Sequence, residues 1–332
     1  MKDKIIEEIK RIPRIPRSIY KRFQKMLRTL LPESVKAKYF NTLENLVVIS
    51  GQNCSLKCKN CANFSPYLAK MIPFYPYEEI CADIEEITKH TQIKNMQLQG
   101  GEFFLHPNAT QILEYVAGNP RIHRITIATN ATIVPKDSIL SLIKESGKIR
   151  LRLSNYGEAN HKSAQKLEST LTQWKIPYWI HCYASGDGNW VDCGGKSVKR
   201  LKESVVQKIF KECIFGQCGG CLTMENGFIS KCSRAVVAHL VQGFALGKND
   251  GILVRQNAQR IFSAYNVANG GGGGVELPAF SFDTLQNFLA SQTPLQACYY
   301  CYGTSGQEIP AGVQLSKEEL NFINTPLTST DN

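Results

Sequence analysis

The sequence predicts an α/β fold built around a parallel sheet or barrel. From Asn41 onward, short runs rich in β-branched residues alternate with longer runs of helical periodicity. Strands that alternate with helices pair in parallel through right-handed crossover connections. The polar and cysteine motifs follow these predicted strands, and ligands bind at the carboxyl ends of the strands in such sheets. We therefore expect a ligand site at that edge of the sheet.

The predicted elements follow one another in a regular order. Strands are expected at residues 46–50, 95–99, 124–128, 148–153 and 178–182. Helices are expected between them, at residues 77–90, 109–117, 138–145 and 161–174. Beyond about Gly186 the regular alternation ends. One more helix is expected at 203–212, and a hairpin at 222–232 with Glu225-Asn226-Gly227 as its turn.

The composition is that of a soluble globular protein, with 332 residues, of which 43% are hydrophobic and 20% charged. The chain shows neither a signal peptide nor an apolar run long enough to span a bilayer, so a cytoplasmic location is expected. The net charge of +11 is concentrated at the N-terminus, where residues 1–38 contain twelve Lys/Arg and four Asp/Glu. The remainder is close to neutral, which argues against a nucleic-acid partner.

Residues 1–40 form a basic N-terminal extension in which apolar and basic residues are interleaved. From Ser18 onward the spacing is that of an amphipathic helix, which could contact an anionic membrane surface or an acidic partner. An extension that packs on its own domain with a solvated basic face is the alternative interpretation.

The chain contains twelve cysteines, and in a reducing compartment clustered cysteines indicate metal or redox chemistry. Cys54, Cys58 and Cys61 have the spacing C-x3-C-x2-C directly after the first predicted strand. Three thiolates on one loop can each bind one iron of a cubane and leave the fourth iron open to a small molecule. A zinc site would normally need a fourth nearby Cys or His, and none lies in this loop.

Three further motifs at successive strand ends accompany the triplet: Gly100-Gly101-Glu102, Thr129-Asn130 and Ser154-Asn155. Over residues 45–185 the chain therefore resembles the radical SAM superfamily. The resemblance implies a partial (β/α)6 TIM-like barrel and a [4Fe–4S] cluster on the triplet that binds S-adenosyl-L-methionine (SAM). It assigns SAM contacts to Gly100, Gly101, Glu102, Thr129, Asn130, Ser154 and Asn155.

One position of the triplet departs from the family pattern. The family usually has an aromatic residue before the third cysteine, near the adenine, and this chain has Asn60 there. The adenine is then expected to contact the backbone near Asn60 or the side chain of Tyr183.

A second set of cysteines resembles the SPASM and twitch extensions of the same superfamily. Cys213 and Cys232 flank Gly227 at the spacing of such extensions, and Cys298-x2-Cys301 supplies a further pair. This resemblance implies an auxiliary [4Fe–4S] cluster on Cys213, Cys232, Cys298 and Cys301. Cys218 or Cys221 could replace Cys213, and a structural zinc site is the alternative.

The expected domain plan has four parts. A radical SAM partial barrel occupies residues 41–202 after the extension, a small twitch/SPASM-like domain residues 203–315, and a polar tail residues 316–332.

The resemblance implies an oxidoreductase or epimerase that reductively cleaves SAM to a 5′-deoxyadenosyl radical and abstracts hydrogen from a substrate. An external one-electron donor such as flavodoxin or ferredoxin is expected. The phrases Cys61-Ala-Asn-Phe-Ser-Pro and Glu308-Ile-Pro are similar to those of relatives among polysaccharide-biosynthesis enzymes, which favours a carbohydrate or other small polar substrate. Cys182 and Cys193 are candidate hydrogen donors. A ribosomal peptide-modifying enzyme and a non-catalytic iron–sulfur or zinc scaffold are the alternatives.

Overall fold

The computed structural model describes residues 31–183, 190–218, 220–255 and 276–324. The predicted extension at 1–40 therefore lies mostly outside the described residues, except for the short helix α3. The helices are α3 (Glu33–Tyr39), α4 (Ser65–Leu68), α5 (Tyr77–His90), α6 (Ala109–Gly118), α7 (Asp137–Ser146), α8 (His161–Trp174), α9 (Glu203–Glu212), α10 (Ile214–Gln217), α11 (Ser233–Gln242), α13 (Phe282–Ala290) and α14 (Lys317–Asn324). Short 3-10 turns are η1 (Phe103–Leu105), η2 (Gly157–Ala159) and η4 (Gln296–Tyr300).

The strands form one large sheet and one small sheet. They are β1 (Thr42–Ile49), β2 (Gln92–Gln99), β3 (Ile122–Thr129), β4 (Ile149–Asn155), β5 (Tyr178–Cys182), β6 (Trp190–Val191), β7 (Cys221–Glu225), β8 (Phe228–Ser230), β9 (Ile252–Leu253) and β10 (Glu308–Ile309). The large sheet has the order β5-β4-β3-β2-β1-β7-β8-β9, and β6 pairs with β10 in the small one.

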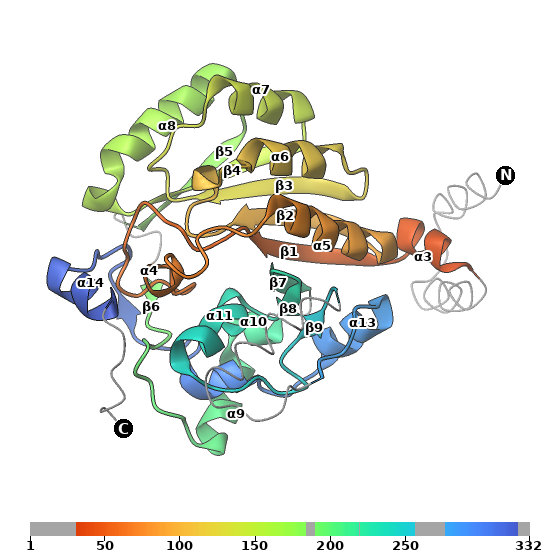
Figure 1. The fold of residues 1–332 in the computed structure, drawn as a ribbon, viewed down its shortest axis with the longest axis vertical. Helices are drawn as coiled ribbons and strands as arrows, with labels where there is room; N and C mark the ends of the chain where they lie inside the picture. Colours follow the sequence, from red (N-terminus) through yellow and green to blue (C-terminus); the bar gives the residue numbers. More distant parts are fainter. Residues whose placement is uncertain (1–30, 184–189, 219, 256–275, 325–332) are drawn as a thin grey trace, which may run out of the picture.

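The large sheet confirms the predicted α/β fold with parallel strands. Strands β1 to β5 pair in parallel in the order of the chain. The sixth parallel strand is β7, which pairs with β1 rather than with β5. In Figure 1, β7, β8 and β9 lie on the β1 side of the sheet together with α9, α11 and α13, away from α7 and α8. The C-terminal part of the chain thus extends the sheet that the N-terminal part begins.

Side chains alternate between the two sides of this sheet because successive residues of a strand point in opposite directions. One side packs against α5–α8 and is apolar: Val48, Leu98 and Ile127 are at most 1% exposed. The other side, which we call the inner side, carries the in-register row Val47, Gln97, Thr126 and Arg150. The core is continuous, because buried residues of β7, β8 and α11 join the same cluster as those of β1 to β4.

The predicted hairpin is present between β7 and β8. Its two turn residues, Asn226 and Gly227, have φ values of 45° and 77°. Two consecutive positive φ values define a type I′ turn, which Asn-Gly adopts readily. The pairing of Glu225 with Phe228 confirms the register set by that turn.

The first part of the predicted polar tail is helical. Helix α14 occupies Lys317–Asn324, and Glu319 forms an ion pair of 2.6 Å with Lys59 in the cysteine loop. Ser316 accepts a hydrogen bond from Glu319 N at 3.1 Å, which caps the first turn. This helix therefore has both a local cap and a partner elsewhere in the fold.

The loops after β1 and β2 continue side by side beyond the strands. Gly101 N donates to Gly51 O at 2.9 Å, and Glu102 N donates to Asn53 O at 2.8 Å. A Cβ atom on Gly101 would lie 2.3 Å from Asn53 O. The close approach of these two loops therefore requires glycine at position 101.

We predict that Gly101→Ala lowers the free energy of unfolding by about 1–3 kcal/mol, because a methyl group forced against backbone separates the two loops. Chemical denaturation monitored by circular dichroism measures the change. Gly118→Ala is the matched control, because a Cβ there meets no atom within 4 Å. It should leave stability unchanged or raise it by up to about 1 kcal/mol, since alanine is the better helix former. Equal effects of the two substitutions would contradict the close-approach argument.

Candidate functional site

The cysteine loop follows β1 and lies at the carboxyl edge of the sheet, as predicted. Cys58 is buried with 8% exposure, whereas Cys54 and Cys61 are half-buried. Burial raises the pKa of Cys54 to about 12, and the nearby thiols of Cys61 and Cys58 act in the same direction. Burial likewise raises the pKa of Cys58 to about 11, with a further contribution from Cys61. The three sulfur atoms are thus within electrostatic reach of one another.

Two side-chain amides direct N–H groups at these sulfur atoms. Asn130 Nδ2 lies 3.4 Å from Cys54 Sγ, and Gln314 Nε2 lies 3.3 Å from Cys58 Sγ. Hydrogen bonds to ligand sulfurs are a characteristic outer-shell feature of iron–sulfur sites. Asn130 is expected from the family resemblance as a SAM contact, and its hydrogen bond to Cys54 is a further role that the sequence does not indicate. Gln314 was missed because nothing in its local sequence relates it to a cysteine 256 positions earlier.

The segment around Gln314 pairs with the cysteine loop as a short antiparallel bridge. Lys59 N donates to Val313 O at 2.8 Å, and Leu315 N donates to Lys57 O at 2.8 Å. Gln314 Oε1 accepts from Lys57 N at 2.7 Å. Since that oxygen must face a donor, the amide nitrogen is the end that faces Cys58.

Glu102 lies beside the triplet, with 2% exposure. Thr129 Oγ1 donates to both carboxylate oxygens, at 3.0 and 2.9 Å. Asn130 N donates to Oε2 at 2.8 Å, and Phe104 N donates to Oε1 at 3.1 Å. Burial raises the pKa of Glu102 to about 7, against the effect of these hydrogen bonds. The structure therefore brings Glu102, Thr129 and Asn130 together as one group.

Ser154 and Asn155, the predicted pair at the end of β4, make different contacts. Ser154 is buried, and its carbonyl accepts from Asn160 Nδ2 at 2.7 Å. Asn160 Nδ2 also donates to Asn130 O, which ties the ends of β3 and β4 together. Asn155 Oδ1 accepts from Gly157 N at 3.0 Å and so shapes the local turn.

Aromatic rings gather next to the triplet, where Asn60 itself is exposed. Tyr156 and Tyr183 stack at 5.2 Å between centroids, and Trp190 meets Tyr156 edge-on at 5.5 Å. Burial raises the pKa of Tyr156, with smaller contributions from Tyr183, Cys58 and Cys61. Tyr183, which the sequence analysis offers as an adenine contact, thus stacks on Tyr156 beside the cysteine loop.

The donor set of this loop fits an iron–sulfur cluster. Three thiols lie on one loop, and two of their sulfurs accept amide hydrogen bonds. Metal binding favours the thiolate form of such cysteines, and it therefore opposes the rise in pKa that burial causes. The described residues contain no group of three or more His, Cys, Asp or Glu arranged around a single metal ion. A cubane instead gives each thiolate its own iron, so its ligands need not meet at one point.

The second cysteine set also comes together in space. Burial raises the pKa of Cys232 to about 12, with contributions from the neighbouring Cys301 and Cys213. Burial also raises the pKa of Cys298, with contributions from Cys232, Cys301 and Cys213. Segments separated by up to 88 positions in the sequence thus place these four predicted ligands within electrostatic reach of one another.

The two candidate hydrogen donors lie in different places. Cys193 Sγ donates to Gly303 O at 3.3 Å and interacts electrostatically with the thiols of Cys301 and Cys232, so Cys193 belongs to the second cysteine group. Cys182 pairs with Asn155 and shares its side of β5 with Tyr178 and Ile180, which pack on the helix-covered core. The inner-side residues of that strand are Trp179 and His181.

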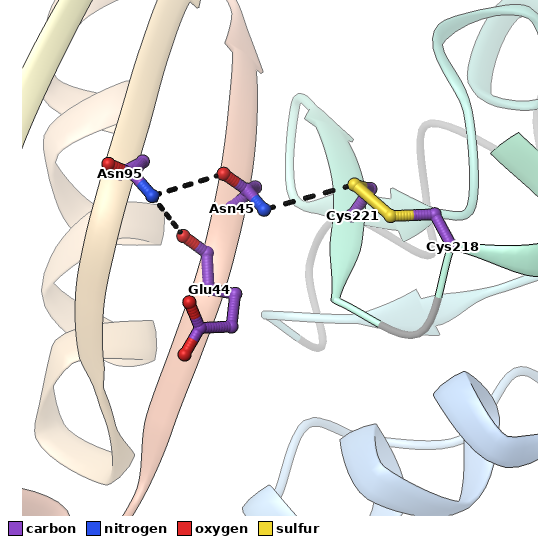
Figure 2. The surroundings of a disulfide bond; sticks show 5 residues. All are labelled: Glu44, Asn45, Asn95, Cys218 and Cys221. Atoms are coloured by element: carbon purple, nitrogen blue, oxygen red, sulfur yellow. Dashed lines mark hydrogen bonds between the residues drawn. A yellow bond between two sulfur atoms is a disulfide. The ribbon is translucent and has the colours of Figure 1, made fainter. Parts of the chain in front are cut away.

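Cys218 and Cys221 form a disulfide with each other (Figure 2). Cys221 is the first residue of β7, and its Sγ lies 3.9 Å from Asn45 Nδ2 on β1. In this state neither sulfur is a thiolate, so neither replaces Cys213 as a metal ligand.

A buried carboxylate that the sequence did not indicate lies on the other flank of the loop. Glu225 ends β7 with 3% exposure, and Gln52 Nε2 and the Tyr75 hydroxyl each donate to its Oε1 at 2.8 Å. Burial raises the pKa of Glu225 to about 7. Its only sequence signal is the hairpin turn that follows it. The contact with Gln52 comes from the pairing of β7 with β1, which local patterns do not reveal.

No helix in the described part of the chain has the length and apolar character needed to cross a bilayer.

Comparison with known proteins gives one family match and several distant relatives. Residues 48–154 match the family model of the Radical SAM superfamily. The antilisterial bacteriocin subtilosin biosynthesis protein AlbA of Bacillus subtilis (strain 168) is 24% identical over 123 residues, covering 36% of this chain. Those residues are 26% of the relative, so the chain spans about a quarter of its length.

Among solved structures, BtrN in complex with AdoMet and 2-DOIA aligns at a TM-score of 0.46 and 14% identity. The alignment covers 82% of this chain and 98% of BtrN. Streptococcus suis SuiB bound to the precursor peptide SuiA aligns at a TM-score of 0.38 and 15% identity, covering 69% of this chain and 66% of SuiB.

The matched residues 48–154 contain the cysteine loop, the Gly100–Gly101–Glu102 turn and Ser154. This part of the chain therefore matches a superfamily that uses a [4Fe–4S] cluster together with SAM.

Proposed function

We propose that the chain is an enzyme that reductively cleaves SAM and abstracts a hydrogen atom from a small polar substrate, a sugar or similar polyol. The observation that carries the proposal is the contact between the cysteine loop and the Glu102 group at the carboxyl edge of the sheet. The resident cluster and SAM supply a 5′-deoxyadenosyl radical when an external donor such as flavodoxin or ferredoxin provides one electron.

The protein's own residues bind and orient these groups. Cys54, Cys58 and Cys61 hold the cluster, and the amides of Asn130 and Gln314 donate to two of the sulfurs. The carboxylate of Glu102 supplies a fixed negative charge for the SAM ammonium group, since charge-assisted hydrogen bonds are the strong ones. Gly100 and Gly101 let the backbone approach closely, and Ser154 lies buried at the end of β4.

We assign the adenine to the aromatic group of Tyr156 and Tyr183. Their stacked rings lie next to Cys58 and Cys61, at the carboxyl ends of β4 and β5. Offset stacking of aromatic rings contributes about 0.5–1.5 kcal/mol beyond area burial. These rings take the place of the aromatic residue that the triplet lacks at Asn60.

We further propose that residues 203–315 bind an auxiliary [4Fe–4S] cluster through Cys213, Cys232, Cys298 and Cys301. The electrostatic coupling among these thiols and the disulfide at Cys218–Cys221 support this choice of four. Cys193, which lies within electrostatic reach of Cys301 and Cys232, then belongs to the auxiliary site and is not a hydrogen donor to substrate.

Modification of a peptide is the second candidate function. The local match to a bacteriocin biosynthesis protein favours it, because a bacteriocin is a peptide product. That match is confined to about a quarter of the relative, so we rank the small polar substrate first.

Replacing Cys54, Cys58 and Cys61 together by alanine should abolish 5′-deoxyadenosine formation, because the protein then cannot hold the cluster that SAM binds. The assay is anaerobic reconstitution followed by SAM and dithionite, with the product quantified by chromatography. Cys81→Ala is the matched control, since Cys81 lies in α5 outside both cysteine groups. Full activity of the triple variant, or no 5′-deoxyadenosine from the wild-type protein, would refute the proposal.

The reconstituted wild-type chain should contain about eight irons, because two [4Fe–4S] clusters are expected. Cys298→Ala/Cys301→Ala should retain about four irons, as measured by iron and sulfide analysis. Cys218→Ala/Cys221→Ala should keep about eight, because these cysteines are not ligands in our assignment. A loss of iron in this second variant would show that the disulfide-forming pair takes part in the site.

Gln314→Leu should lower the midpoint potential of the cluster on the triplet by about 40 mV. An N–H donor to sulfur stabilises the more negative, reduced cluster, and one neutral hydrogen bond contributes about 1 kcal/mol to a one-electron couple. Redox titration followed by electron paramagnetic resonance measures the shift in a Cys298→Ala/Cys301→Ala background. Gln307→Leu, at an exposed position, serves as the control and should leave the potential unchanged. A potential that is unaffected by Gln314→Leu would disprove the role of this contact.

A further inference from the structure

The inner side of the sheet carries several arginines to which the proposed SAM cleavage assigns no role. The strand register places Asn45, Asn95 and Arg124 in one row, and Val47, Gln97, Thr126 and Arg150 in the next. Arg152 follows two residues later on β4 and pairs with Trp179 of β5. Three arginines therefore share the inner side of two adjacent strands, β3 and β4.

Within the described part of the chain, these arginines have no acidic partner. No ion pair involves Arg124, Arg150 or Arg152 within the residues that the structure describes. Arg150 Nε donates to Thr126 Oγ1 at 3.3 Å, and its guanidinium lies 4.9 Å from the Trp179 ring centroid. Arg152 Nε is a buried donor without a hydrogen-bond partner among the described residues. A buried guanidinium donor without a protein acceptor is costly, so water or a ligand must supply the acceptor.

Neutral amides occupy the neighbouring strands on the same side. Asn95 Nδ2 donates to Asn45 Oδ1 at 3.2 Å, and Gln97 Nε2 donates to Gln99 Oε1 at 2.7 Å. Figure 2 shows Asn45 and Asn95 side by side on β1 and β2. Amides offer both donors and acceptors, which suits hydroxyl groups.

We propose that the inner side of the sheet binds a phosphorylated sugar, with the phosphate on Arg150 and Arg152 of β4 and the hydroxyls on the amides of Gln97 and Gln99 of β2. The inference rests on the proposed function, because it names the substrate class of that same site. Guanidinium groups match phosphate oxygens in a bidentate fork.

The two arginines of β4 lie close enough to the carboxyl edge of the sheet for a bound sugar to reach the proposed SAM site. Arg152 and Arg150 precede Ser154 by two and four residues, which places them about 7 and 13 Å below the carboxyl edge of the sheet. One sugar ring can bridge from there to the edge where the Glu102 group and the cysteine loop lie. An acidic peptide would need charges along its length, whereas the unpaired arginines are confined to two strands.

Isothermal titration of the reconstituted holoenzyme in the presence of SAM tests the inference, with glucose 1-phosphate, glucose and a hexaglutamate peptide as probes. Glucose 1-phosphate should bind at least tenfold more tightly than glucose. Arg150→Gln/Arg152→Gln should weaken its binding about tenfold to a hundredfold, the loss expected for hydrogen bonds to a charged group. Arg152→Lys keeps the positive charge but not the two-pronged guanidinium, so it should weaken glucose 1-phosphate binding less than the double variant does.

Lys162→Gln/Lys166→Gln is the matched control, because it removes the same charge from the exposed face of α8. It should bind glucose 1-phosphate as the wild type does, and melting temperatures of all variants report folding. Equal binding of glucose and glucose 1-phosphate, equal losses in the two double variants, or tighter Arg-dependent binding of hexaglutamate would each overturn the inference.

The test separates this inference from the proposed function. A wild-type preparation that forms 5′-deoxyadenosine but shows no preference for the phosphorylated sugar overturns the inference alone. A preparation that binds glucose 1-phosphate through Arg150 and Arg152 but never cleaves SAM overturns the proposed function alone.

Discussion

The loops that follow β1 and β2 are held backbone to backbone, by hydrogen bonds from Gly101 N to Gly51 O and from Glu102 N to Asn53 O. Because the next residue after Asn53 is Cys54, this contact sets the position of the triplet relative to the Glu102 carboxylate. Glu102 then fixes the end of β3 through Thr129 and Asn130, and Asn130 in turn reaches Cys54 Sγ. The site is thus a closed chain of contacts, so displacement of one loop would displace the others.

A second buried carboxylate holds the same loop from its opposite flank. Glu102 lies on the β2 side and Glu225 on the β7 side, where it accepts a hydrogen bond from Gln52. Burial raises the pKa of each to about 7, because the hydrogen bonds that each carboxylate accepts only partly offset its loss of solvation. The cysteine loop is therefore bounded on both flanks by buried carboxylates.

The sequence predicted the parts of this arrangement that depend on local patterns. Helices at 77–90, 161–174 and 203–212 have the predicted bounds, because a 3.6-residue period continues to their ends. Strands β1 and β2 begin about three or four residues earlier than predicted, since their first residues include the polar Glu44 and Lys94, which pair with each other across the strands at 2.7 Å. Hydrophobic runs alone do not include such residues.

The parts that the sequence did not reveal depend on contacts between distant segments. The placement of β7 beside β1 brings Glu225 to Gln52, and the bridge at residues 312–315 brings Gln314 to Cys58. The pairing of Cys218 with Cys221 in a disulfide was also not expected, because a C-x2-C pair is compatible with metal binding and with a disulfide. In each case the residue types are common and only the tertiary fold gives them a partner.

Arg234 connects the two cysteine groups physically. It follows Cys232 by two residues, its guanidinium lies 4.3 Å from the ring centroid of Phe64, and Phe64 follows Cys61 by three residues. The same guanidinium donates to Gly194 O at 2.6 Å, next to Cys193, and helps to lower the pKa of Cys301. With 6% exposure, this cation is shielded from solvent, so its interactions are stronger than those of a surface arginine. A change in the charge of either cysteine group would therefore act on Arg234 and, through it, on the loop that carries the other group.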